Sequence, residues 1–255
     1  MTEQEYRTAE GVNKTTLWEM RKSPAHYKYL LEHPAEDTAA LHFGRALHSA
    51  ILTPEAFSAE YFIAPDVDRR TKAGREQYAE WKAALPQCAE ELTAEDARTI
   101  HEMADAIMAN GAAADLIADT MREYPIFWDD KKLGIRCKCR IDALGKNAVV
   151  DLKTTADILT FDRDAYHYGY HVQAAHYLRG VEAETGRFLD WYFIAMEKKP
   201  PYGLKIIKAT AGFIDYGDFI RDELLEQVKS CTASGEWPSY PAGEISEPHW
   251  ADWGD

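Results

Sequence analysis

Two carboxylates and a lysine stand close together in the middle of the chain. Asp142 ends one strand-like segment, and Asp151 and Lys153 lie on a second segment after a Gly-Lys-Asn turn at residues 145–147. Because alternate residues of a strand point to the same side, Asp151 and Lys153 share a face. Two carboxylates with room for one ion between them form a hard oxygen site for Mg²⁺ or Mn²⁺. The ammonium can orient water or stabilise charge on a phosphate, so the spacing suits metal-dependent phosphodiester hydrolysis. An exposed hairpin with cross-strand ion pairs fits the spacing alone equally well.

The surrounding residues 134–155 predict the β-hairpin that positions these groups. On its first strand Arg136, Lys138 and Arg140 alternate with apolar residues and share the face of Asp142. The apolar run before Asp151 predicts that the second strand enters the core. One face of the hairpin is therefore apolar, and the other gathers the carboxylates together with several cations.

The rest of the chain predicts a mixed α+β fold with a central mixed sheet flanked by helices. Helices are predicted at residues 13–31 with a break at Ser23-Pro24, at 38–53, and in 65–82 after an initial loop. Further helices are predicted at 93–119 with an interruption at Asn110-Gly111, at 161–184 and at 213–231. Strands are predicted at residues 123–128, in the hairpin, at 188–196 and at 204–210. We expect residues 1–255 to form one domain, with a mainly helical part at 1–120 and an irregular tail at 235–255.

Composition narrows the functional classes. The 255 residues carry a net charge of −14, which argues against a nonspecific polyanion binder but allows a nuclease whose cations gather in one groove. No apolar run approaches the length of about 20 residues that a membrane helix needs, and the first residues do not resemble a signal peptide. The four cysteines include no Cys-x-x-Cys, so we expect a reduced, cytoplasmic protein without a zinc ribbon.

Basic and aromatic residues outside the hairpin are candidates for contact with a nucleic acid. Arg69, Arg70, Lys72 and Arg75 precede Tyr78 and Trp81 in a loop that leads into a helix, a combination that suits phosphate contact with base stacking. A solvated loop and an ordinary amphipathic helix are the structural alternative.

The predicted helix at 161–184 carries a second group of candidates. Tyr166, Tyr170, Gln173 and Tyr177 recur at steps of four, three and four and share one face. A glutamine amide there can bond both to a ligand carboxylate and to a nucleic-acid backbone, although aromatic residues at this spacing also suit a core. His167 and His171 have a spacing that could bind zinc, but without a third ligand we expect surface histidines.

Taken in order, these segments resemble the RecE-type phage recombination exonucleases (the exonuclease VIII family), which are relatives of lambda exonuclease in the PD-(D/E)xK superfamily. The resemblance covers residues from about 11 to 240. Its Asp-x-Lys alone is weakly specific, whereas the ordered set is strongly specific. Ile141 stands where the motif's name has proline, a position without a chemical role. The matching stretches are SPAHYKYLLEHP, FGRALHSAILTPEAF, APDVDRRTKAG, GIRCKCRIDAL, VVDLKTTADI, YHYGYHVQAAHYLRG and EWPSY.

The resemblance implies an activity, an assembly and a partner. Such enzymes have a restriction-endonuclease-like core and degrade the 5′-ended strand of linear double-stranded DNA in the 5′ to 3′ direction. They leave 3′ single-stranded overhangs on which a single-strand annealing protein loads. Relatives form homotrimer rings through which DNA threads, and a ring would place cations in the channel and acids outside. Arg136, Lys138 and Arg140 would then hold the DNA backbone near the site of cleavage.

The resemblance also assigns roles within the site. His48, on the predicted helix at 38–53, would join Asp142 and Asp151 in binding two Mg²⁺ (or Mn²⁺) ions. Lys153 would position the attacking water. The Leu152 carbonyl would be a further metal ligand. Gln173 and Tyr177 would support the site and the DNA strand, and Glu123 would add an outer carboxylate.

Three other interpretations remain open at this stage. A restriction or repair endonuclease could use the same fold and the same carboxylates. A catalytically inactive DNA-binding protein on this fold is a second, which the intact Asp142, Asp151 and Lys153 oppose. A zinc hydrolase built on His167 and His171 is the third.

Overall fold

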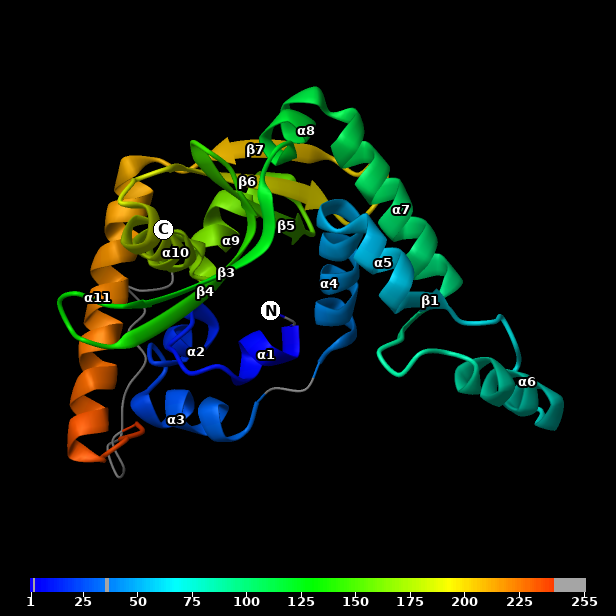
Figure 1. Cartoon of the computed structure of the whole chain (residues 1–255), viewed down its shortest axis with the longest axis horizontal. Coiled ribbons are helices and arrows are strands. Elements are labelled where there is room, and N and C mark those ends of the chain that lie inside the picture. Colours follow the sequence, from blue (N-terminus) through cyan, green and yellow to red (C-terminus); the bar gives the residue numbers. More distant parts are fainter. Residues whose placement is uncertain (2, 35–36, 241–255) are drawn as a thin grey trace, which may run out of the picture.

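A five-stranded mixed sheet lies at the centre of the computed structural model, which describes residues 1, 3–34 and 37–240. Its strand order is β3-β4-β5-β6-β7 (Figure 1). The strands are β3 (Met121–Asp129), β4 (Arg136–Leu144), β5 (Ala148–Thr155), β6 (Asp190–Glu197) and β7 (Leu204–Lys208). β5 and β6 pair in parallel, whereas the other neighbours are antiparallel. The predicted mixed sheet is therefore confirmed, and its parallel pair requires the helical crossover between β5 and β6.

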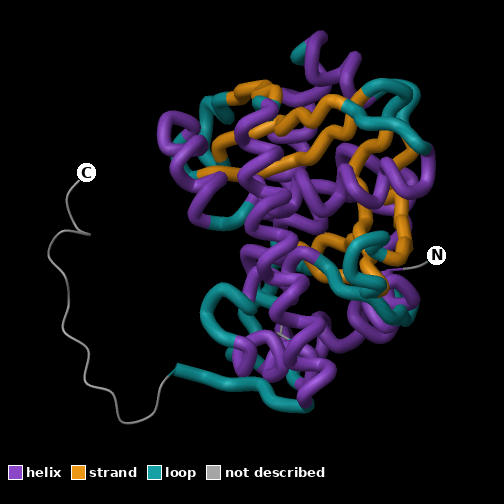
Figure 2. The backbone as a smooth tube through the Cα atoms, turned by 90° about the vertical axis from the view of Figure 1, so that its left-hand side faces the viewer, coloured by secondary structure: helices purple, strands orange, loops and turns teal. Residues whose placement is uncertain are grey.

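Helices cover both faces of this sheet (Figure 2). On one face Val149, Trp191 and Phe193 pack with α2 (Lys14–Glu19), α9 (Phe161–His167), α10 (Tyr170–Thr185) and α11 (Ala211–Ser234). On the other face Val150 and Leu152 pack with α4 (Ala39–Leu52), α5 (Pro54–Glu60), α7 (Ala94–Ala109) and α8 (Gly111–Ile117). Successive residues of β5 thus enter opposite cores, as the pleat of a doubly covered strand requires.

Short elements complete the chain. The remaining helices are α1 (Glu3–Thr8), α3 (Pro24–Glu32), α6 (Lys72–Ala83) and the 3₁₀ turn η1 (Ile158–Thr160). β1 (Tyr61–Ile63) and β2 (Glu90–Leu92) form a separate parallel pair. Residues 235–240 are irregular, and the rest of the predicted tail lies outside the described residues. Among the described residues no helix combines the length and apolarity needed to cross a membrane.

Polar caps fix where the predicted helices begin. Asn13 accepts from the backbone N–H of Thr16 at the start of α2, and Thr38 accepts from that of Leu41 at the start of α4. These side chains satisfy backbone donors that the first helical turn leaves unpaired. The helix that carries His48 consequently begins one residue after Thr38, close to the predicted boundary.

The predicted helix at 161–184 is two helices, which corrects its expected continuity. Gly169 separates α9 from α10 and has φ 68°, a left-handed conformation that glycine adopts without steric cost. A Cβ added there would lie 2.7 Å from the ring of Trp18. The chain therefore turns at this point, and Tyr166 lies on α9 while Gln173 and Tyr177 lie on α10.

Candidate functional site

The hairpin opens where the candidate site begins. β4 and β5 pair through Ala143 with Val150 and Leu144 with Val149, and the ladder ends there. Beyond this point the Asp142 carboxylate accepts a hydrogen bond from the Leu152 backbone N–H at 2.8 Å. Because β4 and β5 diverge here, the Asp142 carboxylate lies between them. It accepts the hydrogen bond from β5 that a backbone carbonyl of β4 would accept if the ladder continued.

Three potential metal ligands from three elements meet at this opening. One ligand atom each from His48 on α4, Glu123 on β3 and Asp142 on β4 lies within 4.8 Å of the other two. His48 Nδ1 is 3.4 Å from Asp142 Oδ2. Glu123 has φ 49° and interrupts the pairing of β3 with β4, a strained conformation for a residue with a side chain. Such strain is often found where a side chain is held for function, and here it occurs at a candidate ligand.

The charges of this cluster depend on one another. Burial lowers the pKa of His48, but the Asp142 carboxylate opposes this more strongly, and the net pKa is raised. Burial raises the pKa of Asp142, but His48, Lys153 and the Leu152 amide together lower it. Burial and the Asp142 carboxylate raise the pKa of Glu123 to about 7, although His48 lowers it. The Glu123 carboxylate also accepts a hydrogen bond from Arg140 Nε at 2.5 Å. The negative charges crowd together in a partly dry site, which a bound cation would relieve.

The second carboxylate lies beside this cluster and has its own partners. Asp151 is 2% exposed, and its Oδ1 accepts a hydrogen bond from Gln173 Nε2 on α10 at 2.5 Å. Its Oδ2 forms an ion pair with the Lys153 ammonium but makes no hydrogen bond of ordinary geometry. Burial raises the pKa of Asp151 to about 6, although Lys153 lowers it. The Lys153 ammonium also lies 4.9 Å from the ring centroid of Tyr170.

The residues present fit a divalent metal. Two carboxylates and an imidazole from three separate elements can converge on one ion, and carboxylate oxygens suit Mg²⁺ and Mn²⁺. The buried Asp151 oxygen without a hydrogen bond is a further potential ligand. Among the described residues, the cluster of three possible metal-binding side chains consists of His48, Glu123 and Asp142. His167 and His171 belong to no such cluster among these residues.

Comparison with known proteins agrees with this geometry. A family model described as a PDDEXK-like domain of unknown function (DUF3799) matches residues 14–247. The chain belongs to this family. Membership in the PDDEXK-like family places the protein in the PD-(D/E)xK superfamily, as the hairpin motif indicated, and the central sheet flanked by helices has the expected architecture.

Solved structures support the fold of this PDDEXK-like chain. A crystal structure from Eubacterium rectale, of a protein provisionally named an exonuclease, has a TM-score of 0.68 and 14% sequence identity. The match covers 98% of this chain and 95% of that one, so it shows a shared fold. The crystal structure of SSO0001 covers 75% of this chain and 87% of that one at 14% identity, with a TM-score of 0.31 that carries no argument. No curated protein sequence matched at a significant level.

The cations of the hairpin have different environments in the PDDEXK-like fold, and one expectation requires correction. Lys138 is 4% exposed and donates to the backbone carbonyls of Tyr6, Arg7 and Ala9, so its ammonium is not available to DNA. Arg140 lies at the metal-ligand cluster through Glu123. Arg136 is exposed and lies 3.4 Å from Asp129.

The N-terminal segment causes the burial of Lys138. The edge of β4 that β5 leaves open is paired instead by Val12, whose N–H donates to the Arg136 carbonyl at 2.9 Å. The Val12 carbonyl in turn accepts from the Lys138 N–H at 2.9 Å. Residues 6–9 then lie over the lysine side chain. Strand alternation identified the correct face but could not show that another segment covers it.

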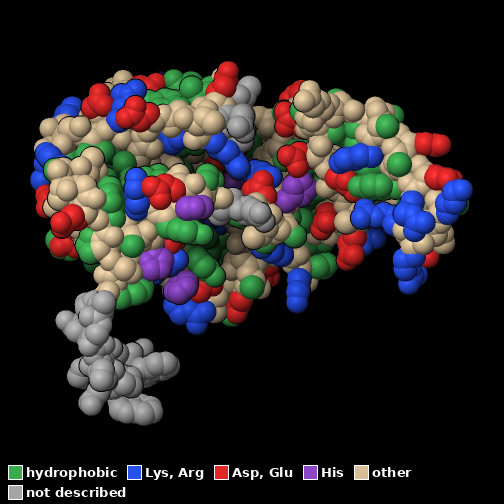
Figure 3. All heavy atoms as spheres, turned by 90° about the horizontal axis from the view of Figure 1, so that it is seen from below, with side chains coloured by type: hydrophobic (Ala, Val, Ile, Leu, Met, Phe, Trp, Pro, Cys, Tyr) green, Lys and Arg blue, Asp and Glu red, His purple; other side chains and the backbone are tan. Residues whose placement is uncertain are grey.

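The predicted basic loop lies away from the metal-ligand cluster. Arg69, Arg70, Lys72 and Arg75 lie on an arm around α6 that stands apart from the five-stranded sheet (Figure 1). Viewed from below, Lys and Arg side chains gather at this end of the molecule (Figure 3). Arg70 and Lys72 have highly exposed side chains, while Arg69 stacks on Tyr78 with 4.4 Å to the ring centroid.

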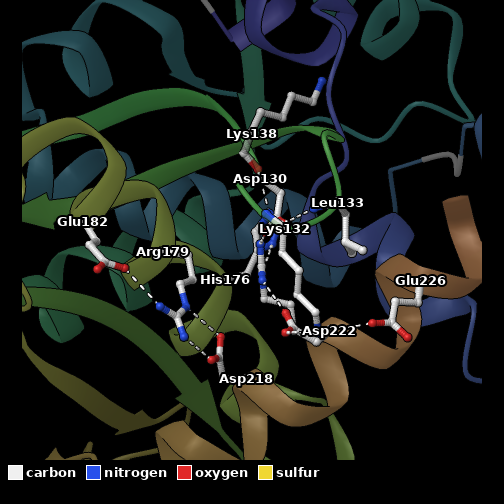
Figure 4. Close-up of polar contacts among 11 residues, drawn as sticks. Asp130, Lys132, Leu133, Lys138, His176, Arg179, Glu182, Asp218, Asp222 and Glu226 are labelled. Atoms are coloured by element: carbon white, nitrogen blue, oxygen red, sulfur yellow. Dashed lines mark hydrogen bonds and ion pairs between the residues drawn. The ribbon is translucent and has the colours of Figure 1, made fainter.

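A buried polar network behind the hairpin was not predicted. Arg221 on α11 is 1% exposed and donates to Asp130 in the turn between β3 and β4. Figure 4 labels Asp130 together with His176 and Lys138 of the same network. The Arg221 Nε lies 3.4 Å from His176 Nδ1, and His176 Nε2 lies 3.2 Å from the Lys138 carbonyl. These contacts fasten α10 and α11 to the hairpin. A lone arginine in an amphipathic helix gives no sequence signal of such a role.

His171 and Tyr177, both on α10, are more buried than a surface position would make them. His171 was expected at the surface but is 3% exposed, because Trp18, Tyr216 and Phe213 surround its ring. Tyr177 is partly buried against the core, with its ring centroid 5.9 Å from that of Trp191. Burial raises the pKa of Tyr177 well above its usual range, so its hydroxyl stays protonated beside the carboxylates.

Proposed function

We propose that this PDDEXK-like protein is a divalent-metal-dependent exodeoxyribonuclease. It degrades the 5′-ended strand of linear double-stranded DNA in the 5′ to 3′ direction and leaves 3′ overhangs for recombination by strand annealing. The observation that carries the nuclease proposal is the meeting of His48, Glu123 and Asp142 beside the pair formed by Asp151 and Lys153. Polarity rests on the resemblance to RecE-type exonucleases alone. End-dependence rests on the same resemblance and is supported by the provisional name of the Eubacterium rectale protein, an exonuclease.

In this proposal one set of residues binds the metal ions, and a second set orients the water and the phosphate. His48, Glu123, Asp142 and Asp151 would hold two ions, with the Leu152 carbonyl as a further ligand. Bound Mg²⁺ or Mn²⁺ supplies Lewis acidity toward the phosphate and lowers the pKa of a bound water.

The chain's own groups then orient the reactants. Gln173 donates to Oδ1 of the Asp151 carboxylate, while Lys153 pairs with Oδ2. The Lys153 ammonium, 15% exposed at its side chain, donates toward the water or phosphate oxygen next to Asp151. A fixed ammonium in a partly dry site stabilises developing negative charge more than it would in water.

The proposal includes an assembly that accounts for the charge of −14. We infer a homotrimer ring whose channel carries the exposed cations while acids face outward. Arg136, Arg140 and the arm around α6 would contact the DNA backbone. A single-strand annealing protein would receive the 3′ overhang.

End-labelled DNA tests the proposal. Linear duplex labelled at either end, and covalently closed plasmid, are incubated with Mg²⁺ and with chelator. We expect release of label from 5′ ends, an intact plasmid, and no reaction in chelator. Asp151→Ala and Lys153→Ala should abolish degradation, whereas Lys146→Ala, an exposed lysine in the turn between β4 and β5, should not.

Each other outcome has a definite meaning. Cleavage of closed plasmid would replace the exonuclease by an endonuclease. Binding of duplex without cleavage under Mg²⁺ and Mn²⁺ would indicate an inactive DNA-binding protein. Full activity of either purified active-site variant would refute the assignment of Asp151 and Lys153.

A further inference from the structure

A second lysine lies next to the proposed site without any assigned role. Lys14, at the start of α2, donates to the Tyr168 carbonyl at 2.5 Å. Its ammonium lies 5.8 Å from the ring centroid of Tyr170, and the Lys153 ammonium lies 4.9 Å from the same centroid. Two ammonium groups therefore share one aromatic ring beside the buried carboxylates.

Aromatic rings continue from this point to the surface. Tyr170 is followed by Tyr168, with 6.0 Å between ring centroids, and Tyr168 is 53% exposed. Trp18 lies 5.6 Å from the Lys14 ammonium, and the exposed Arg21 guanidinium lies 4.5 Å over the Trp18 ring. Together Lys14, Trp18, Arg21, Tyr168 and Tyr170 form a path from Lys153 outward, which we name the aromatic–basic path.

The path is held in place by the fold. The turn at Gly169 lies against the face of Trp18, where an added Cβ would be 2.7 Å from the ring. The Lys14 bond to the Tyr168 carbonyl ties α2 to the same turn. The exposed Tyr168 ring therefore projects from a turn that is fixed on both sides.

The charges of the path call for an anion. Glu19, on the same helix, forms its ion pair with Lys22 at 2.8 Å. Like charges held together beside exposed aromatic rings are complementary to a chain of phosphates that carries flat bases, which is the chemistry of single-stranded nucleic acid.

We propose that the aromatic–basic path binds an unpaired stretch of the DNA strand next to the cleavage site. One base stacks on Tyr168, and Lys14 and Arg21 contact neighbouring phosphates. This deepens the proposed function by naming unpaired DNA as what the site receives, and it rests on that function. Duplex ends would then need to open locally before the strand reaches Lys153.

Binding of short single-stranded oligodeoxynucleotides by the full chain, measured by fluorescence anisotropy in chelator, tests the path apart from catalysis. Tyr168→Ala should weaken binding roughly 5- to 100-fold, the usual effect of losing one base–aromatic stack. Tyr168→Phe keeps the ring and should bind within about twofold of wild type. Tyr29→Ala is the matched control, because Tyr29 is 64% exposed and stacks on His33 in a different part of the chain.

Removal of single bases from the oligonucleotide locates the stack. When the missing base is the one that stacks on Tyr168, wild type and Tyr168→Ala should bind the abasic strand equally weakly, because the Tyr168 ring then has no base to stack on. Lys14→Gln should reduce the slope of log affinity against log salt by about 0.7, as for one phosphate contact on a single strand, and Lys14→Arg should restore it. Melting curves check that each variant is folded.

The results separate this proposal from the nuclease assignment. The path would be overturned if folded Tyr168→Ala bound the oligonucleotide as tightly as wild type. It would also be overturned if every abasic position lowered the affinity of wild type and of Tyr168→Ala by the same factor. Both conclusions hold whether or not the protein cuts DNA. The predicted pattern in a protein that fails to cut DNA would support the path and refute the nuclease. Equal affinity for duplex and single strands would also count against the path.

Discussion

The buried pair of Asp151 and Lys153 predicts a specific dependence of stability on pH in metal-free protein. Lys153→Met keeps an unbranched side chain of similar length but removes the ammonium. The Asp151 carboxyl, 2% exposed, then keeps Gln173 as its hydrogen-bond partner and loses the adjacent cation. We expect its pKa to rise beyond the wild-type value, because burial is no longer opposed.

The magnitude follows from the wild-type shift. Burial raises the pKa of Asp151 from 3.8 to about 6 in the folded protein. The folded chain therefore binds a proton that the unfolded chain has released, and this contribution to stability is lost as pH rises from about 4 to about 6. Above about pH 7 the wild-type carboxyl is ionised in both states. Up to the raised pKa of its Asp151, the folded variant keeps the proton that its unfolded chain has released, and its stability falls by roughly 1.4 kcal/mol per pH unit. Relative to pH 6, a folded variant that keeps this proton to pH 8 should lose about 1.4 kcal/mol at pH 7 and about 2.8 kcal/mol at pH 8.

Urea unfolding in chelator at pH 6, 7 and 8 measures this difference, with tryptophan fluorescence as the probe. Trp191 lies in the core beside β5 and is 2% exposed. The double variant Asp151→Asn/Lys153→Met has no carboxyl at residue 151 to titrate, so it should lack the additional slope that Asp151 gives the single variant, while the slope from Glu123 remains. Lys146→Met controls for loss of an exposed lysine. A stability difference that is the same at all three pH values would refute the reasoning, because Asp151 would then stay ionised without Lys153.

Two further predictions concern His48 as a metal ligand and Lys138, whose ammonium is buried. His48→Gln should weaken Mn²⁺ binding at least about tenfold in calorimetric titration without DNA, whereas His42→Gln, on the same helix but paired with Glu90, should not; equal affinities would remove His48 from the ligand set. Lys138→Met should lower the free energy of unfolding by about 1–3 kcal/mol, because three carbonyls lose a charged donor. The DNA affinity of the folded Lys138 variant should stay within about twofold, and a large loss of affinity with unchanged stability would restore Lys138 as a DNA contact.

The local part of the site was accessible from sequence because it depends on strand geometry. Alternation alone placed Asp151 and Lys153 on one face, and the turn at 145–147 brought Asp142 toward them. Helical periodicity likewise directed Gln173 to the side of α10 that meets Asp151. His48 became a candidate through resemblance, since a lone histidine on an apolar helix carries no signal of its partners.

The chain's own residues thus determined the hairpin, the order of elements and the acid–lysine pair, all of which follow from contacts between near neighbours in sequence. The tertiary structure decided which groups complete the site. It brought Glu123 to His48 and Asp142 through a strained residue in β3, and it covered Lys138 with residues 6–12 because β5 leaves the edge of β4 open. It also set Lys14 and Tyr168 beside Lys153. The contacts of Lys14 and Lys138 join segments more than a hundred residues apart, and His48 comes from a helix far from β3 and β4 in sequence. No local pattern encodes such packing.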